Sequence, residues 1–167
     1  MSLIIGSCHC KNISYELWLP INETIATRSC SCSFCSKHST TYTSHKDAVL
    51  KATFKSELLV NRYTFGTNTA QFIFCSQCGV LCFVISVIDQ STYAVVNVNT
   101  FEHKEKWHII SSQISFDAES LEERLHRRKR TWIPNVSITI ILQLEVRNVG
   151  SNNPTHLSTL PQGCQGN

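Results

Sequence analysis

The decisive stretch of this sequence is Cys75-Ser76-Gln77-Cys78-Gly79, in which two cysteines are separated by two residues and followed by a glycine. This spacing is typical of the tight turn, or knuckle, from which two thiolates bind one zinc ion. A second pair, Cys8-His9-Cys10, lies far upstream, and its thiols are too close for an unstrained disulfide. Together the two pairs supply the four ligands of a closed structural zinc site, which would contribute directly to folding.

A third cluster, Cys30-Ser31-Cys32-Ser33-Phe34-Cys35, offers only three cysteines. A zinc ion held by this cluster would keep one coordination position for water, a substrate or another side chain. Three protein ligands and an open position are the pattern of a catalytic zinc. Two alternatives stay open, because the site could be a second structural one completed by His38, or it could stay vacant. We therefore expect two zinc ions, one structural and one catalytic or labile.

The start of the chain and its charge bear on location and partners. Residues 1–6 lack the basic start, apolar run and cleavage site of a secretory signal, so we expect reduced thiols and a cytoplasmic protein. No apolar stretch approaches the length of about 20 residues that spans a bilayer. The formal charge of +3 counts every cysteine as neutral. Seven thiolate ligands and two zinc ions would bring it to zero, so we expect neither a membrane nor a nucleic-acid partner.

Most of the chain has the pattern of β-strands. β-Branched and aromatic residues dominate segments 13–18, 58–65, 71–74, 80–88, 93–98 and 136–146, with turn formers between them. Residues 66–69 connect two of these segments as a hairpin would. The pattern predicts an all-β, antiparallel domain over residues 1–147. Residues 148–167 are rich in Asn, Ser, Pro and Gly, and we expect them to form a polar, poorly ordered tail.

One helix is predicted late in the chain, over residues 117–129. Acidic residues begin this segment and basic residues end it, which matches the helix dipole, and Pro134 prevents its continuation. Leu121 and Leu125 form a narrow apolar stripe with which the helix can cover a sheet. The basic run 124–130 is interpreted either as a phosphate-binding patch or as a solvated helix end, and we favour the solvated end.

Four motifs give the chain a resemblance to a known family. They are Gly6-Ser7-Cys8-His9-Cys10, Cys30-Ser31-Cys32-Ser33-Phe34-Cys35-Ser36-Lys37, Tyr63-Thr64-Phe65-Gly66 and Phe74-Cys75-Ser76-Gln77-Cys78-Gly79. In order and spacing they resemble the glutathione-dependent formaldehyde-activating enzymes, a family that includes centromere protein V. The resemblance covers roughly residues 3–135.

The resemblance implies a zinc-stapled, tent-like β-fold that is shared with the Rab exchange-chaperone family. It assigns the structural ion to Cys8, Cys10, Cys75 and Cys78, and the catalytic ion to Cys30, Cys32 and Cys35. The implied activity is that of a carbon–sulfur lyase of the S-(hydroxymethyl)glutathione synthase type, which adds glutathione or a related thiol to formaldehyde or another small aldehyde. The alternative is a non-catalytic zinc module that binds a protein or chromatin partner.

Four positions around the motifs carry further expectations. Arg28 and Lys37 flank the three-cysteine cluster and are candidates to hold the carboxylates of the thiol. Lys11 stands where the family has a glycine, which would strain a turn that requires a positive φ. Residues 80–82 replace the small polar residue and histidine of the family, so we expect no family-type substrate contact there, and Cys82 is predicted to be a small buried side chain.

Overall fold

The computed structural model describes residues 1–21 and 24–141 of the 167-residue chain. A smaller sheet consists of β1 (Ser2–Ser7), β2 (Ile13–Leu19), β5 (Val49–Phe54) and β11 (Asn135–Ile140). A larger sheet consists of β3 (Thr24–Cys30), β4 (Tyr42–Thr43), β6 (Val60–Tyr63), β7 (Gln71–Cys75), β8 (Leu81–Ile88), β9 (Ser91–Asn97) and β10 (His108–Ile114). The helices are α1 (Ser33–Lys37), α2 (Leu121–Thr131) and the 3-10 turns η1 (Glu57–Leu59), η2 (Val98–Thr100) and η3 (Lys104–Lys106).

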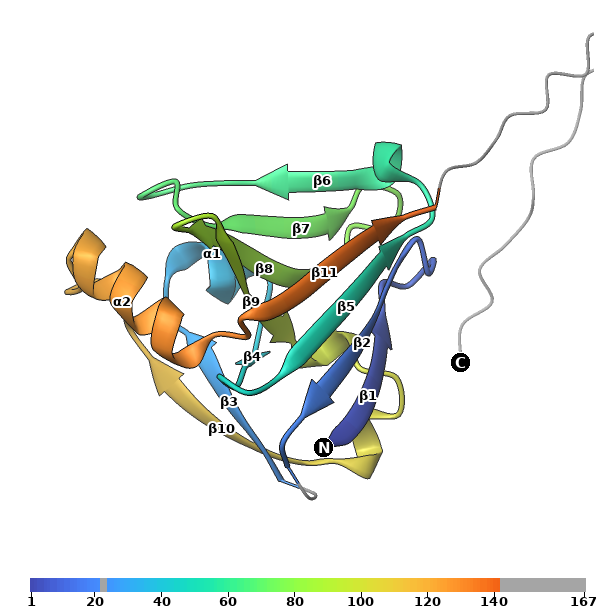
Figure 1. Ribbon diagram of the computed structural model, residues 1–167, viewed down its shortest axis with the longest axis horizontal. Helices are drawn as coiled ribbons and strands as arrows, with labels where there is room; N and C mark the ends of the chain where they lie inside the picture. The colour runs from blue at the N-terminus through green and yellow to red at the C-terminus, as the bar shows by residue number, and fades with distance from the viewer. Residues whose placement is uncertain (22–23, 142–167) are drawn as a thin grey trace, which may run out of the picture.

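The two sheets face each other, with α2 at one end (Figure 1). The strand order is β1-β2-β5-β11 in the smaller sheet and β10-β3-β4-β9-β8-β7-β6 in the larger one. The prediction of an all-β fold with one long helix is confirmed. The hairpin predicted at residues 66–69 joins β6 to β7, which pair in antiparallel fashion.

The purely antiparallel arrangement predicted from the sequence is wrong at two sheet edges. β10 runs parallel to β3, and β11 runs parallel to β5. Both partners are far apart in the sequence, so no hairpin connects them and no local turn sets their direction. Strand patterns also missed β1, β3, β4, β5 and β10. In β10 the reason is plain, since this edge strand exposes five of its seven residues and has no apolar alternation to detect.

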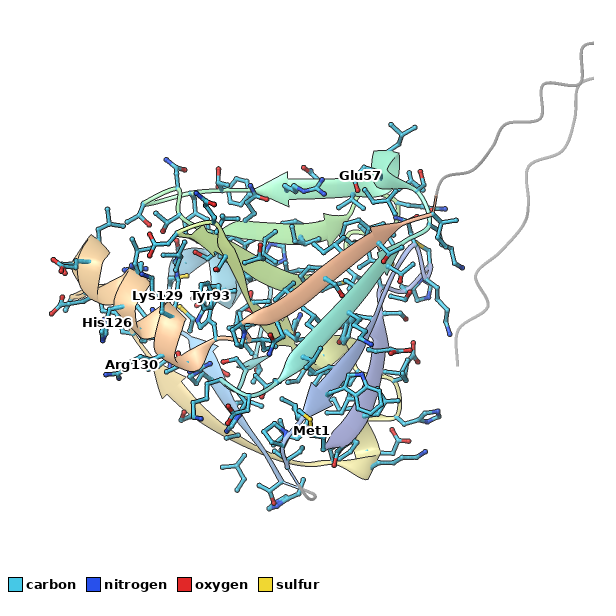
Figure 2. All side chains as sticks on the ribbon, in the orientation of Figure 1. Met1, Glu57, Tyr93, His126, Lys129 and Arg130 are labelled. Atoms are coloured by element: carbon cyan, nitrogen blue, oxygen red, sulfur yellow. The ribbon has the colours of Figure 1, made fainter. Side chains whose placement is uncertain are left out.

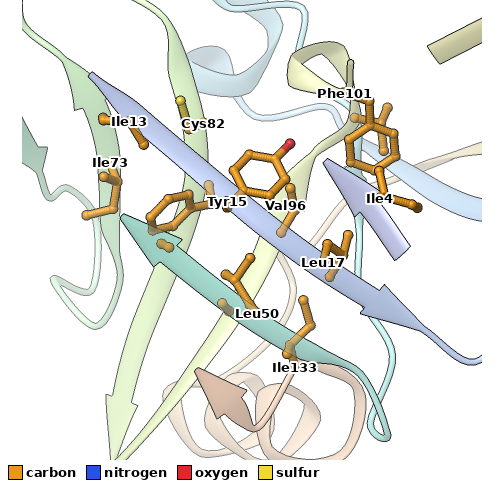
Figure 3. Packing of buried hydrophobic residues seen from close by; sticks show 14 of the residues in the cluster. Ile4, Ile13, Tyr15, Leu17, Leu50, Ile73, Cys82, Val96, Phe101 and Ile133 are labelled. Atoms are coloured by element: carbon orange, nitrogen blue, oxygen red, sulfur yellow. The ribbon is translucent and has the colours of Figure 1, made fainter. Parts of the chain in front are cut away.

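The main core lies between the two sheets. β2 alternates buried and more exposed residues, as its sequence predicted, and points Ile13, Tyr15 and Leu17 inward. Figure 3 shows these side chains packed with Leu50 of β5 and residues of the larger sheet. Cys82 belongs to this core and has no exposed surface, as expected.

A second apolar cluster lies on the other face of the larger sheet, and it positions the functional site. β8 is buried on both faces except at Val87. Phe83 and Ile85 face the main core, whereas Leu81 and Val84 pack in the second cluster with Trp132, which directly follows α2. The larger sheet therefore separates the main core from a region beneath α2.

The helix α2 begins later than predicted. Ser120 caps it, because the Ser120 hydroxyl accepts from the backbone of Glu123 while the Glu123 carboxylate accepts from the backbone of Ser120. Residues 117–119 therefore precede the helix, which ends at Thr131 rather than at Lys129. No helix among residues 1–21 and 24–141 is long and apolar enough to cross a membrane. The predicted tail and residues 142–146 of the last predicted strand lie outside the described residues.

Candidate metal sites and their cavity

The first cysteine cluster joins the two sheets. Cys8 and Cys10 lie in the turn between β1 and β2, Cys75 is the last residue of β7, and Cys78 lies in the turn between β7 and β8. The four sulfur atoms lie within 4.8 Å of one another. The Sγ atoms of Cys8 and Cys10 are 3.7 Å apart, and those of Cys10 and Cys75 are 3.3 Å apart. A zinc ion with Zn–S bonds of about 2.3 Å places its sulfurs about 3.8 Å apart, so the cluster fits one such ion.

The two turns hold their sulfurs with unusual backbone conformations. Gly79 has φ +73°, and Lys11 has φ +61°, so Lys11 adopts the left-handed conformation that glycine takes more easily. The Lys11 backbone N–H donates to the Cys8 carbonyl, and the Ile13 N–H donates to the Cys8 sulfur at 3.3 Å. Burial raises the pKa of the Cys75 thiol to about 12.

The second cysteine cluster is built around the short helix α1. Cys30 ends β3, Cys32 is the N-cap of α1, and Cys35 lies within the helix. Their sulfur atoms lie within 4.8 Å of one another. A hydrogen bond from the Cys35 thiol lowers the pKa of Cys30 to about 6, and the same bond together with burial raises the pKa of Cys35. The cluster could hold a metal ion through three sulfur donors.

His38, the alternative fourth ligand, is not among the candidate metal ligands that lie together in this cluster. Its ring lies against two aromatic rings, with centroids 4.7 Å from Phe34 and 5.4 Å from Phe74. The sulfur cluster as the structure describes it therefore contains three candidate ligands.

A cavity of about 270 Å³ adjoins the three cysteines. Much of its wall is apolar or aromatic, and these residues are Tyr42, Phe65, Ala70, Phe72, Val84, Val95, Ile114, Phe116 and Trp132. Cys30, Cys32 and Cys35 form the sulfur-bearing part of the wall. A small molecule in this cavity would touch the second cluster, whereas the first cluster does not line it.

The two basic residues proposed as carboxylate ligands are placed differently. Arg28 lines the cavity and lies opposite Tyr42 across the β3–β4 pair, and its guanidinium donates to the Ser44 hydroxyl. Burial, followed by the nearby Arg127, lowers the pKa of Arg28. Lys37 is exposed on α1 and is not among the residues that line the cavity. The structure thus brings Arg28 to the site and leaves Lys37 outside it.

Three basic residues that the sequence analysis assigned to a solvated helix end also line the cavity. These residues are Arg124, Arg127 and Arg128 of α2, and Arg128 is only 6% exposed. The solvated interpretation was wrong for them because the helix covers the cavity with this face. Their spacing of three and four residues, which places side chains on one helix face, was the signal available in the sequence. Arg130 is exposed and points away from the molecule (Figure 2).

Ring stacking and hydrogen bonds hold two of these arginines in place. The Arg127 guanidinium lies 3.7 Å from the centre of the Phe116 ring, and it bonds both Glu119 oxygens, at 2.6 and 2.9 Å. Nη1 of Arg128 donates to the Thr69 carbonyl and hydroxyl, both at 2.9 Å, and to the Ser86 hydroxyl at 3.1 Å. Burial, followed by repulsion from Arg127 and Arg124, lowers the pKa of Arg128 to about 10.

The family described as "Glutathione-dependent formaldehyde-activating enzyme" matches residues 3–114, a stretch that contains both cysteine clusters and ends before α2. The chain is also similar to a protein of Rhodobacter sphaeroides whose crystal structure is known. The two share 23% sequence identity over 65% of this chain and 99% of that chain, with a TM-score of 0.46.

Proposed function

Because the chain belongs to the glutathione-dependent formaldehyde-activating enzyme family, we propose that it adds glutathione, or a related thiol, to formaldehyde or another small aldehyde. The reaction forms a bond between the thiol sulfur and the carbonyl carbon, and the thiol proton ends on the former carbonyl oxygen. The reverse reaction is that of a carbon–sulfur lyase. The observation that carries this proposal is the three-cysteine cluster in the wall of the cavity.

We propose zinc as the metal of both clusters, because sets of thiolates at these separations suit zinc. Cys8, Cys10, Cys75 and Cys78 would hold the structural ion, and Cys30, Cys32 and Cys35 would hold the second ion. When bound there, the second ion would keep a thiol substrate deprotonated at neutral pH. We place the activity in the cytoplasm, where thiols stay reduced, and all eight described cysteines are free.

The protein's own residues bind and orient the reactants. Phe65, Phe72 and Val84 surround the cavity with apolar surface, which excludes water from the reacting sulfur and carbon. Arg28 lies two residues before Cys30 on β3, so the two side chains leave the strand on the same side. A guanidinium there can hold a carboxylate of the thiol while its sulfur lies at the cysteine cluster.

The alternative function is a non-catalytic zinc module that binds a protein or chromatin partner. A module that binds chromatin would need its basic residues on the surface. The inward direction of Arg124, Arg127 and Arg128 instead supports a small anionic molecule as the ligand.

The proposal is tested with protein in which cobalt replaces zinc. Glutathione should change the cobalt–thiolate absorption of the wild type, because its sulfur can join the second site, whereas S-methylglutathione should not. Cys32→Ser should abolish the change. Exchange NMR with formaldehyde then measures hemithioacetal formation, which should be faster with wild type than with Cys32→Ser. A wild-type spectrum that stays unchanged at millimolar glutathione would support the non-catalytic module instead.

A further inference from the structure

Apart from the three cysteines, the charged side chains around the cavity are mostly basic. Its charged lining residues are Arg28, Asp117, Arg124, Arg127 and Arg128. Among the described residues, Arg127 alone of the four arginines forms an ion pair, and its partner is Glu119. The other three guanidiniums donate only to neutral groups. Asp117, an exposed residue that accepts from the Ser115 hydroxyl at 2.9 Å, is the single carboxylate among the described residues that line the cavity.

These cations are partly or fully withdrawn from water. Arg128 is buried, Arg28 and Arg124 are half-buried, and the Nε atoms of Arg124 and Arg128 are buried without a hydrogen-bond partner in the described structure. After burial itself, repulsion from Arg127 lowers the pKa of Arg28, and repulsion from Arg127 and Arg124 lowers the pKa of Arg128. Withdrawing unpaired positive charge from water is costly, and an anionic ligand would offset that cost.

Two of the three arginines keep free donors for a ligand. The Arg124 guanidinium makes one described bond, from Nη2 to the Phe116 carbonyl at 2.6 Å, and Arg28 makes one, to Ser44. Each guanidinium has five N–H groups, so most of them remain available. In Arg128, by contrast, Nη1 already donates to three acceptors on Thr69 and Ser86. Arg124 and Arg28 are thus the better anion ligands.

We propose that the cavity recognises an α-amino-acid head group on the thiol, with Arg124 and Arg28 binding carboxylates and Asp117 binding the ammonium group. The ligand class is a peptide thiol that carries two carboxylates and a free amino group. The inference rests on the proposed function and adds the residues that set thiol specificity. Asp117 and Arg124 lie beyond residues 3–114, so the family match does not include them.

S-Methylglutathione separates head-group binding from metal binding, because its blocked sulfur is not a thiolate ligand. We expect calorimetry on the zinc-loaded wild type to detect its binding. Arg124→Gln should weaken this binding about tenfold or more, and Arg124→Lys, which keeps the charge but loses the planar fork, should weaken it less. Arg130→Gln is the matched control on the exposed face of the same helix and should bind like the wild type.

The role of Asp117 is tested with a second ligand, the S-methylglutathione analogue in which hydrogen replaces the α-amino group. Wild type should prefer the amino form about tenfold, and Asp117→Asn should bind both forms alike. The proposal is overturned if S-methylglutathione does not bind the wild type, if folded Arg124→Gln binds it normally, or if Asp117→Asn keeps the preference. These results do not depend on the cobalt spectrum, so failure of head-group recognition is distinguishable from failure of the proposed function.

Discussion

Arg128 is a buried cation, and the groups that accept its hydrogen bonds also have other hydrogen-bond partners. The Thr69 carbonyl also accepts from the Ser86 hydroxyl at 2.7 Å, and the Thr69 hydroxyl also pairs with that of Thr67 at 2.8 Å. Burial of the guanidinium, however, lowers its pKa to about 10, which means that folding disfavours the charged form. The buried charge of Arg128 therefore destabilises the folded protein, and it lies next to the candidate site.

Arg128→Met should therefore raise the free energy of unfolding by about 1–3 kcal/mol, because a thioether side chain of similar length fills the same space without a charge. Urea unfolding at pH 7 measures the change. Arg130→Met, on the exposed face of α2, should change the unfolding free energy by less than about 0.5 kcal/mol. A loss of stability in Arg128→Met would show that the hydrogen bonds outweigh the cost of burying the charge.

Glu119 holds Arg127 in place across the start of α2. The hydrogen bond from Arg127 lowers the pKa of Glu119 in the folded protein, and both side chains are about one-fifth exposed. A carboxylate with a lowered folded-state pKa stabilises the protein above its unfolded pKa. This contribution is lost as the pH falls through the folded pKa.

Glu119→Gln should lower the free energy of unfolding by about 1 kcal/mol at pH 7. The difference between wild type and variant should shrink as the pH falls below about 4.5. Urea unfolding of both proteins over this range tests the prediction, and taking the difference removes the effects of pH that they share. In a protein that already carries Arg127→Gln, the change in unfolding free energy caused by Glu119→Gln should depend little on pH. A difference that stays constant with pH would contradict the ion-pair explanation.

At the scale of elements, α2 is the cover of the cavity and the carrier of its arginines. Its position depends on its two ends. The capping box of Ser120 and Glu123 fixes the first turn, and the N–H and carbonyl of Ile133, just after the helix, exchange hydrogen bonds of 2.9 Å with Ala94 of β9. Loosening either end would displace Arg124, Arg127 and Arg128 together.

Ser120→Ala should cost about 1 kcal/mol of unfolding free energy, since it removes the side-chain acceptor of the N-cap. It should also weaken S-methylglutathione binding, because the first turn carries Arg124. Thermal unfolding and calorimetry measure the two effects. Glu122→Ala, in the same turn but outside the capping box, is the control and should change stability by less than about 0.5 kcal/mol. Equal effects of the two substitutions would argue against the cap.

At the scale of the whole molecule, the two cysteine clusters have different relations to the fold. The first links the β1–β2 turn of the smaller sheet to the β7–β8 turn of the larger one, so its metal would tie the two sheets together. The second involves only β3 and α1 and borders the cavity. Loss of metal from the first site should therefore unfold the protein, whereas loss of metal from the second site should leave the fold intact.

We expect the reduced, purified protein to contain close to two zinc ions per chain, one of which a mild chelator removes much more readily. Cys75→Ser should unfold the chain, because structural zinc contributes directly to folding, whereas Cys32→Ser should leave a folded protein with one ion. Elemental analysis and circular dichroism measure both effects. If the two substitutions were equally harmless to folding, the division into structural and open sites would be wrong.

Features that depend on local spacing could be predicted from the sequence. Cysteines two and three residues apart have few ways to place their sulfurs, so each local group of thiols was predictable from spacing, and ligand count paired the first group with the last. The alternation in β2 and the hairpin at residues 66–69 were equally local, and both were confirmed.

Which residues surround the second cluster depends on the packing of the whole chain and could not be predicted from local spacing. The parallel pairs β3–β10 and β5–β11 bring together segments that no short turn relates, so their direction depends on packing of the whole chain. The same packing lays α2 over the cavity, turning Arg124 and Arg128 inward while Lys37, close to the cysteines in sequence, stays outside. Helix periodicity states which residues share a face, but the burial of that face depends on what the rest of the chain places against it.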